Sequence, residues 1–243
     1  ADTLAGDLPV TRPALGTAIL EVFGMTVGSV GATERELRWA ERDIRVIHTH
    51  PASHATYYPG AEPMSIKLIA DAATDLILGA QLVGSTGVDK RLDVIATAMT
   101  AGLTASALAD LELAYAPQFG SAKDPINMLG YVARNLRDGL TTSIQWHELD
   151  EELEGGAMLV DVRTPAEFAS GHLAGSRNVD FEASDFKTQI SGLPKDATYA
   201  LYCRSGNRSG QALAVMKAAG FTKVQHLGGG ITSWQAAGRP VVS

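Results

Sequence analysis

The second half of the chain alternates between short apolar runs and stretches with helical spacing. The apolar runs are too short for helices and are typical of strands buried on both faces of a sheet. Such strands are predicted at residues 158–162, 199–203 and 224–227. Helices are predicted between and after them, at residues 165–170, 209–219 and 230–237. Strands that alternate with helices in this way predict an α/β domain with a parallel sheet flanked by helices.

The first half mixes strands and helices without regular alternation. Strands are predicted at residues 16–27, 64–70 and 76–84, the last two forming a hairpin. Helices are predicted at residues 33–44, 92–103 and 126–136. The first of these helices begins with a capping-box pattern, Thr33 followed three residues later by Glu36. This mixture predicts an α+β domain with an antiparallel sheet.

The chain is expected to consist of two domains. The predicted helix at residues 126–136 is followed by Gly139, a typical helix stop, and the alternating pattern begins after it. A length of 243 residues suits two domains of ordinary size. The sequence therefore predicts a first domain at residues 1–139 and a second at residues 140–243.

Composition and charge narrow the classes of function. A net charge of −7 and a pI near 5.3 argue against a nucleic-acid surface. No apolar run approaches the length needed to span a bilayer. The single cysteine excludes an internal disulfide and favours a cytoplasmic setting. His48, His50 and His54 lie close together at an expected strand end and the loop after it, and their spacing favours a solvated loop over a metal site.

The only cysteine stands in a loop between a predicted strand and a predicted helix. The loop reads Cys203-Arg204-Ser205-Gly206-Asn207-Arg208-Ser209. Consecutive backbone N–H groups at a helix start favour an anion, and the thiolate is the reactive form of a cysteine. The two arginines add positive charge, and the glycine allows a tight turn. An inert core cysteine is the commoner situation, but that interpretation leaves the arginines, glycine and serines unexplained.

The second half resembles the rhodanese-family sulfurtransferases. The resemblance is carried by LVDVR with Pro165, Glu167 and Phe168, by GHLAGS with Asn178 and Val179, by the cysteine loop, and by GGI with Trp234, Gly238 and Pro240-Val241. It implies that Cys203 is the nucleophile. It also implies a substrate-binding loop made of Arg204, Ser205, Gly206, Asn207, Arg208 and Ser209. Asp161 and Arg163 are expected to shape this loop from a second layer.

The family mechanism implied by this resemblance is sulfur transfer. Cys203 would attack the outer sulfur of a persulfide, polysulfide or thiosulfate, hold it as a persulfide and pass it to a thiol or cyanide. Arg204 would help to select anionic donors, and Arg208 would support the loop. The six residues from Cys203 to Arg208 match the sulfur-handling members, whereas phosphatases of this fold use a loop one residue longer. His172 and Trp234 are expected to be structural.

The first half resembles the C-terminal dimerisation domain of flavin- and pyridine-nucleotide-dependent disulfide reductases. The resemblance covers most of residues 1–138 and rests on YAPQFGSAKDPINM from Tyr115, YYPG from Tyr57 and GVDKR from Gly87. It is strongest to coenzyme A disulfide reductases, NADH oxidases and persulfide reductases, some of which carry a fused C-terminal rhodanese domain. It implies a homodimer in which Tyr115 and Tyr57, or its neighbour Tyr58, face the partner's flavin-side cysteine.

The chain departs from this family on its N-terminal side. Gly24, Gly28 and Gly31 do not have the spacing or context of a GxGxxG fingerprint, and the flavin-side cysteine is missing. The sequence therefore predicts the C-terminal portion of a longer enzyme whose FAD and NAD domains lie upstream. No cofactor is expected on this chain alone, whereas FAD, NAD(P)H and CoA are expected for the parent enzyme.

Three hypotheses about function follow. The leading one is a sulfurtransferase within a CoA-disulfide or persulfide reductase, in which Cys203 passes sulfane sulfur toward CoA or the flavin-side cysteine for NADH-driven release as sulfide. The second is a non-catalytic sulfur carrier or persulfide sensor. The third is a phosphatase or arsenate reductase, against which the short loop and the single cysteine speak.

Overall fold

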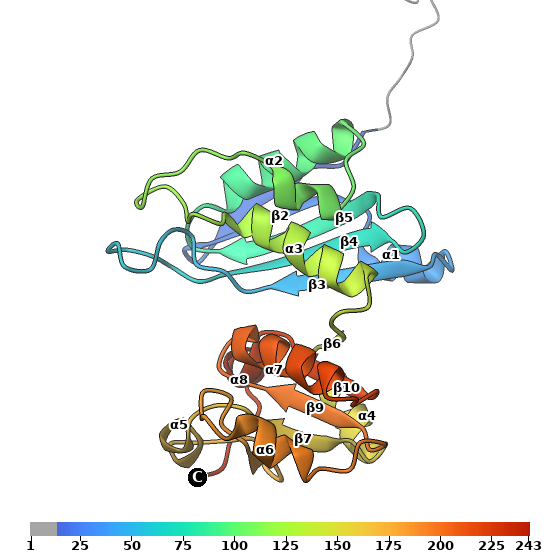
Figure 1. Ribbon diagram of the computed structural model, residues 1–243. Helices are drawn as coiled ribbons and strands as arrows, with labels where there is room; N and C mark the ends of the chain where they lie inside the picture. The colour runs from blue at the N-terminus through green and yellow to red at the C-terminus, as the bar shows by residue number, and fades with distance from the viewer. Residues whose placement is uncertain (1–13) are drawn as a thin grey trace, which may run out of the picture. The chain divides into compact units, whose positions relative to one another are not determined.

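The computed structural model describes residues 14–243 and contains two β-sheets, each accompanied by helices (Figure 1). The chain forms two compact units, the first ending at residue 126 and the second beginning at residue 127 and including residues 48–50. The predicted boundary at 139/140 stays a prediction, and the first 13 residues of the predicted first domain lie outside the described part. Within residues 14–243, no helix is both long and apolar enough to cross a membrane.

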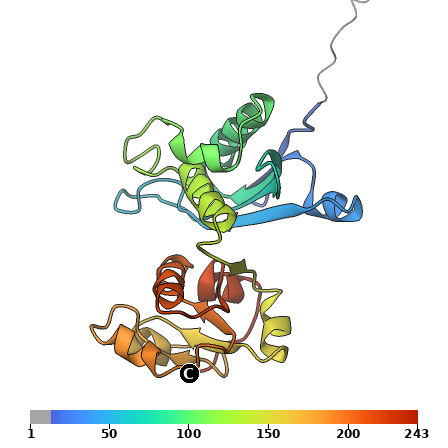
Figure 2. The ribbon, with the colours of Figure 1, turned by 45° about the vertical axis from the view of Figure 1, so that its right-hand side comes forward.

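The first unit is built on a five-stranded antiparallel sheet in the order β1-β2-β5-β4-β3, which confirms the predicted α+β class. The strands are β1 (Ala18–Val22), β2 (Met25–Gly31), β3 (Ile44–Thr49), β4 (Met64–Asp71) and β5 (Ile77–Gly84). The helices in this part of the chain are α1 (Glu34–Trp39), α2 (Val88–Thr100), the 3₁₀ helix η2 (Ser106–Asp110) and α3 (Pro125–Arg137). Helix α2 lies along one face of the sheet (Figures 1 and 2).

The predicted single strand at residues 16–27 is instead the hairpin of β1 and β2. The chain turns at Phe23 and Gly24, whose φ angles are +51° and +75°. Gly24 is the only sign of this turn in the sequence, because the apolar Phe23 continues the strand pattern. In the structure, the Phe23 side chain is fully exposed. The two arms then pair in antiparallel register, with Leu20 opposite Val27.

The predicted hairpin of β4 and β5 and the predicted cap of α1 are confirmed. The Thr33 hydroxyl accepts a hydrogen bond from the Glu36 amide at 3.3 Å, and the Glu36 carboxylate accepts one from the Thr33 amide at 2.8 Å. Helix α1 ends at Trp39, before the predicted residue 44, because the chain reverses at Glu41 with a φ of +52°. His48 lies near the end of β3, in agreement with its expected place at a strand end. His54, in contrast to the expected solvated loop, is buried.

The second unit is built on a five-stranded sheet in the order β6-β10-β9-β7-β8, and its strand pairs are parallel as predicted. The strands are β6 (Ser143–Ile144), β7 (Met158–Asp161), β8 (Arg177–Asn178), β9 (Tyr199–Tyr202) and β10 (Val224–Leu227). The helices are α4 (Leu149–Glu154), α5 (Pro165–Ala169), α6 (Phe186–Ser191), α7 (Asn207–Ala218) and α8 (Gly230–Ala236). The very short strands β6 and β8 and the helices α4 and α6 were not predicted from the sequence.

Strand β9 is the centre of the second sheet and is buried on both faces. Leu201 packs in one apolar layer with Leu213 of α7 and Phe186 of α6. Ala200 and Tyr202 point the other way, into a layer with Trp234 of α8. Packing on both faces therefore fixes the point at which β9 ends and the chain leaves the sheet.

A buried ion pair organises the first unit. Arg91 of α2 is 2% exposed, and its guanidinium donates to the Asp124 carboxylate at 2.8 Å. The same nitrogen donates to the carbonyl oxygen of Ser53 at 2.8 Å. This network joins α2 to two long loops, because Ser53 lies between β3 and β4 and Asp124 lies just before α3.

We expect Asp124→Asn to destabilise the first domain by about 3 kcal/mol, because it leaves the Arg91 charge buried without a counter-charge. Asp93→Asn is the matched control, since Asp93 is exposed on the same helix and forms no ion pair within residues 14–243. Urea unfolding followed by circular dichroism gives the free energy of unfolding of both variants. Equal stability of the two would contradict the importance of the buried pair.

Candidate functional site

Cys203 lies directly after β9 and begins the short loop that leads into α7. Its side chain is 1% exposed, and its Sγ accepts a hydrogen bond from the backbone N–H of Gly206 at 3.2 Å. Gly206 is the N-cap of α7 and has a φ of +98°, in the left-handed region that favours glycine. This turn aims the amide back at the sulfur. A negative charge on the sulfur is therefore favoured both by this amide and by the start of the helix.

The loop is supported from behind by the first turn of α8. The amides of Ile231 and Thr232 donate to the carbonyl oxygens of Cys203 and Arg204 at 2.9 and 3.1 Å. Gly230 has a φ of +57°, and a Cβ atom there would overlap the carbonyl oxygen of Cys203. Only a glycine allows this close approach between the two backbones.

Arg208 is held by two carboxylates. Its guanidinium donates to both oxygens of Glu167 at 2.7 and 2.8 Å and to Glu182 at 3.1 Å. The pairing with Arg208 is the main reason why the pKa of Glu167 falls to about 2. Glu167 in turn raises the pKa of Arg208. The geometry agrees with an Arg208 that supports the loop, while direct contact between Arg208 and substrate stays a prediction.

The other residues of the loop divide into outward and inward positions. Arg204 and Ser205 are exposed, and the Arg204 side chain makes no hydrogen bond or ion pair within residues 14–243. Asn207 is exposed and accepts from Gln211 at 3.0 Å. Ser209 is buried and donates to the carbonyl oxygen of Gly206 at 3.2 Å. Ser209 therefore braces the turn, and Arg204 is the positive group that faces outward.

Asp161 and Arg163 form a buried ion pair at the end of the neighbouring strand β7. Their side chains are 2.6 Å apart, and Arg163 also donates to the carbonyl oxygen of Gly171 at 2.7 Å. The guanidinium of Arg163 lies 5.8 Å from the ring centre of Tyr202, next to Cys203 in the chain. These contacts join β7 to the connection before β8. An effect of the pair on the cysteine loop stays a prediction.

His172 and Trp234 both occupy packed positions. The His172 ring stacks on Phe168 with 3.8 Å between ring centres, and its backbone pairs with Val242. The Trp234 side chain is buried and donates to the carbonyl oxygen of Pro240 at 2.8 Å. Both residues tie the C-terminal segment to the domain.

Sequence reasoning missed three residues around the loop. In the sequence, Glu167 stands out only as part of the family resemblance, and no pattern points to Glu182. His226 of β10 lies 3.4 Å from the Ser209 hydroxyl, and burial lowers its pKa to about 4. The only local signal was Glu167 three residues after Thr164, which predicts a helix cap and not a partner for Arg208.

The first unit carries an exposed pair of tyrosines. The hydroxyl groups of Tyr57 and Tyr115 are 2.8 Å apart, and the two residues are 75% and 49% exposed. This contact raises the pKa of Tyr115, chiefly through the hydrogen bond with Tyr57. Tyr58 instead packs edge-on against His54. Of the two neighbouring tyrosines, Tyr57 is therefore the one that the fold places beside Tyr115.

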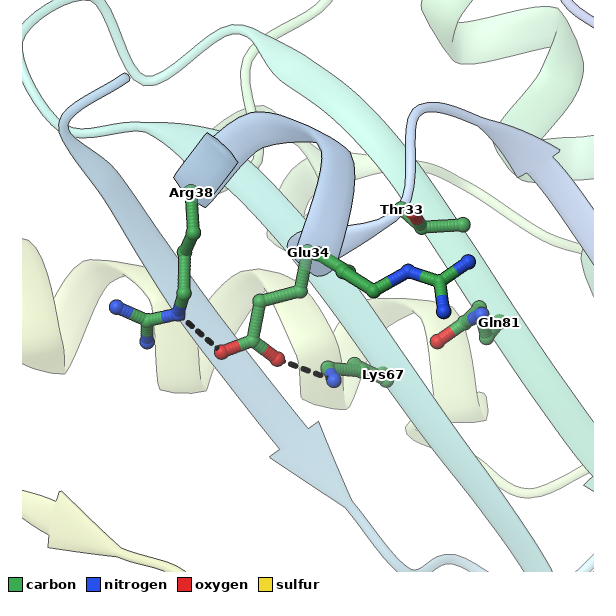
Figure 3. A pocket seen from close by; sticks show the side chains of 6 residues that line it. Thr33, Glu34, Arg38, Lys67 and Gln81 are labelled. Carbon is green, nitrogen blue, oxygen red and sulfur yellow. Dashed lines mark hydrogen bonds and ion pairs between the residues drawn. The ribbon is translucent and has the colours of Figure 1, made fainter. Parts of the chain in front are cut away.

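A surface pocket of about 550 Å³ lies on the first unit (Figure 3). Its lining residues are Thr33, Glu34, Arg35, Arg38, Lys67 and Gln81. Glu34 points between Arg38 and Lys67 and forms an ion pair with each (Figure 3). These lining residues include no nucleophile. Within residues 14–243, no group of three or more His, Cys, Asp or Glu side chains is arranged to hold a metal ion.

The fold and the cysteine loop together define a two-domain protein with a rhodanese-like second domain. A family model for the rhodanese-like domain matches residues 145–237. A family model for the pyridine nucleotide-disulphide oxidoreductase dimerisation domain matches residues 17–124. The chain thus contains a segment similar to the dimerisation domain of pyridine nucleotide-disulphide oxidoreductases, followed by a rhodanese-like segment.

Several known proteins share this arrangement or part of it. The coenzyme A disulfide reductase of Staphylococcus haemolyticus is 39% identical over 137 residues, which is 56% of this chain and 31% of that protein. The crystal structure of reduced Bacillus anthracis CoADR-RHD is 40% identical with a TM-score of 0.87, covering 94% of this chain and 41% of that chain. A NAD-dependent persulfide reductase from A. fulgidus is 33% identical with a TM-score of 0.82, covering 96% of this chain and 41% of that chain. The chain thus spans less than half the length of these relatives.

Gly230→Ala tests the close approach behind the loop. We expect it to destabilise the second domain by about 2 kcal/mol more than Gly238→Ala, because overlap with the Cys203 carbonyl adds to the strain of a positive φ. Gly238 is the matched control, since its φ is +72° and nothing lies within 4 Å of a Cβ atom there. Thermal unfolding measures both losses, and equal losses would contradict the crowding.

Glu167 should stabilise the second domain in a pH-dependent way. Its pKa is about 2 in the folded protein and 4.5 in the ordinary state, so the contribution is complete above about pH 5 and is lost as the pH falls toward 2. The difference in Tm between the wild type and Glu167→Gln is therefore expected to be largest at pH 6 and to shrink steadily to pH 3. The same series for Glu154→Gln should be flat. A pH-independent difference would show that the Glu167 charge is not the stabilising feature.

Proposed function

We propose that this chain transfers sulfane sulfur through a persulfide on Cys203, as part of a CoA-disulfide or persulfide reductase. The observation that carries the proposal is the position of Cys203 Sγ, 3.2 Å from the Gly206 amide at the start of a 12-residue helix. This amide and the helix start would stabilise a negative charge on the sulfur when it acts as a nucleophile or carries a persulfide. An inert core cysteine has no need of such an arrangement.

The proposed cycle has two steps. The Cys203 thiolate attacks the outer sulfur of a persulfide R–S–SH, the donor S–S bond breaks, and R–S⁻ leaves with the electron pair of that bond. Cys203 then carries the sulfur as Cys203–S–SH. An acceptor thiolate attacks this outer sulfur, becomes a persulfide itself and releases the Cys203 thiolate. Neither step needs an external oxidant or reductant.

The relatives suggest the larger context of this chemistry. Their names describe a coenzyme A disulfide reductase and a NAD-dependent persulfide reductase. In such an enzyme, Cys203 would deliver sulfur to CoA or to the flavin-side cysteine, with FAD and NAD(P)H supplying the electrons for release of sulfide. The dimerisation domain would join two chains and direct Tyr57 and Tyr115 to the partner's flavin-side cysteine.

The glycines on the N-terminal side take up positions in a hairpin. Gly24 lies in the β1–β2 turn, and Gly31 is the last residue of β2. Gly28 lies inside β2, where a Cβ atom would be 2.9 Å from Leu92. The chemistry that we propose for this chain is sulfur transfer.

Cys203→Ser tests the proposal directly. After incubation with glutathione persulfide, the intact mass of the wild type should rise by one sulfur atom, and that of the variant should not. Multiple-turnover transfer to cyanide should fall by about 10³-fold or more, because the nucleophile is lost. Glu154→Gln, far from the loop in sequence and without an ion pair in the described part, should behave as wild type.

Three other results would redirect the assignment. Sulfur uptake by Cys203→Ser would contradict the persulfide site. Single uptake by the wild type without multiple turnover would favour the carrier or sensor hypothesis over an enzyme. Hydrolysis of phosphate esters at comparable rates would favour the phosphatase hypothesis.

A further inference from the structure

Glu167 has two structural tasks at once. One carboxylate oxygen caps α5, where it accepts hydrogen bonds from the amide and hydroxyl of Thr164, each at 3.1 Å. Both oxygens also bind Arg208 in a bidentate pair. The cap fixes the carboxylate, and the carboxylate then fixes the guanidinium. Glu182, which is 59% exposed, takes up a further N–H of the same guanidinium.

Arg208 and Cys203 stand at the two ends of the same six-residue loop. The hydrogen-bonded pair with Glu167 is the main cause of the raised pKa of Arg208, and a negative charge on Cys203 would act in the same direction. Arg208 is also five residues after Cys203 and in the first turn of α7. An unpaired guanidinium at this place would attract an anionic donor.

The carboxylates of Glu167 and Glu182 reduce the positive charge that an approaching donor meets. Arg204 and Arg208 bring two positive charges, and Glu167 and Glu182 bring two negative charges, so the formal charges of these four groups cancel. The two carboxylates occupy three of the five N–H groups of Arg208, including the Nη1 and Nη2 pair that can grip a compact oxyanion. Of the two arginines, Arg204 is the one whose charge has no counter-charge in the described part of the chain.

We propose that Glu167, assisted by Glu182, is a specificity-determining residue. Its pairing with Arg208 keeps that guanidinium from binding a donor and biases the Cys203 site against compact dianionic donors. The favoured donors are persulfides of organic thiols, whose reacting sulfurs carry at most one charge. The disfavoured class is represented by thiosulfate, a dianion. This inference rests on the proposed sulfur transfer and names its donor class.

Both donors give the same Cys203 persulfide, so a comparison of the two donors separates donor recognition from the shared second step. With a persulfide, the S–S bond of R–S–SH breaks and R–S⁻ leaves. With thiosulfate, the bond between the outer sulfur and the sulfonate sulfur breaks, and sulfite leaves with the electron pair. Each reaction places one sulfur on Cys203, and cyanide can accept it in both cases.

Glu167→Gln and Glu182→Gln test the inference in the full 243-residue chain. Removing the Glu167 charge should raise kcat/KM for thiosulfate about tenfold through a lower KM, because a freed guanidinium can bind the dianion. Glu182→Gln should give a smaller rise of about twofold, since this carboxylate is exposed. For glutathione persulfide, kcat/KM should change by less than about twofold in either variant.

Two further variants separate a charge effect from a structural one. Glu167→Gln combined with Arg208→Gln should lose the gain with thiosulfate, because the freed cation is gone. Glu154→Gln removes an acidic charge elsewhere in the domain and should leave the ratio of the two donors unchanged. Glu182→Gln keeps the α5 cap, so its donor ratio reports on charge even if Glu167→Gln folds poorly.

The outcomes distinguish this inference from the proposed function. Transfer by the wild type with an unchanged donor ratio in Glu167→Gln and Glu182→Gln would overturn the charge filter alone. A gain with thiosulfate that survives the loss of Arg208 would overturn it as well. A wild type that transfers sulfur from neither donor would overturn both proposals.

Discussion

The burial of β9 is the constraint on which the candidate site depends. Every residue of this strand is buried, and neighbouring side chains point into opposite apolar layers. A shift of one residue would exchange the two layers and expose apolar surface on both faces of the sheet. The strand therefore ends at one place, and Cys203 emerges at the carboxyl edge of a parallel sheet, where ligands bind in folds of this kind. The helix start completes the site with backbone N–H groups.

The carboxylates around the loop come from other segments of the chain, so the loop backbone does not determine the charge around the sulfur. The loop brings two arginines to the sulfur, but their surroundings differ. Arg204 faces outward, whereas Arg208 is gripped by Glu167 and Glu182. The local charge is therefore much smaller than the loop sequence suggests. A site that handles sulfane sulfur from an organic persulfide needs to favour a thiolate without strongly attracting every small anion, and this arrangement is compatible with that need.

The first domain uses buried charge for a different purpose. Arg91 and Asp124 lie in the interior and fasten the loops that carry Tyr57 and Tyr115. The backbone bond from Ala55 to Gly120, at 2.9 Å, joins the same two loops. The tyrosine hydroxyls then meet at the surface, where they are open to a further molecule. Rigid support beneath an exposed polar pair is what an interface residue requires, and it agrees with the dimerisation family of this domain.

The sequence by itself determined the class of both domains and most of the longer elements, and it predicts Cys203 as the nucleophile. These features are local: the periodicity of apolar residues, the Thr33–Glu36 cap, and a strand, loop and helix in direct succession around Cys203. It failed where the local signal was ambiguous, as at Phe23, whose apolar side chain hid a turn. Only the tertiary structure decided that Tyr57 and not Tyr58 lies beside Tyr115, and that Glu167 and Glu182 neutralise Arg208. Those pairings join residues far apart in the chain, and their energies depend on distance in space, which no pattern along the sequence encodes.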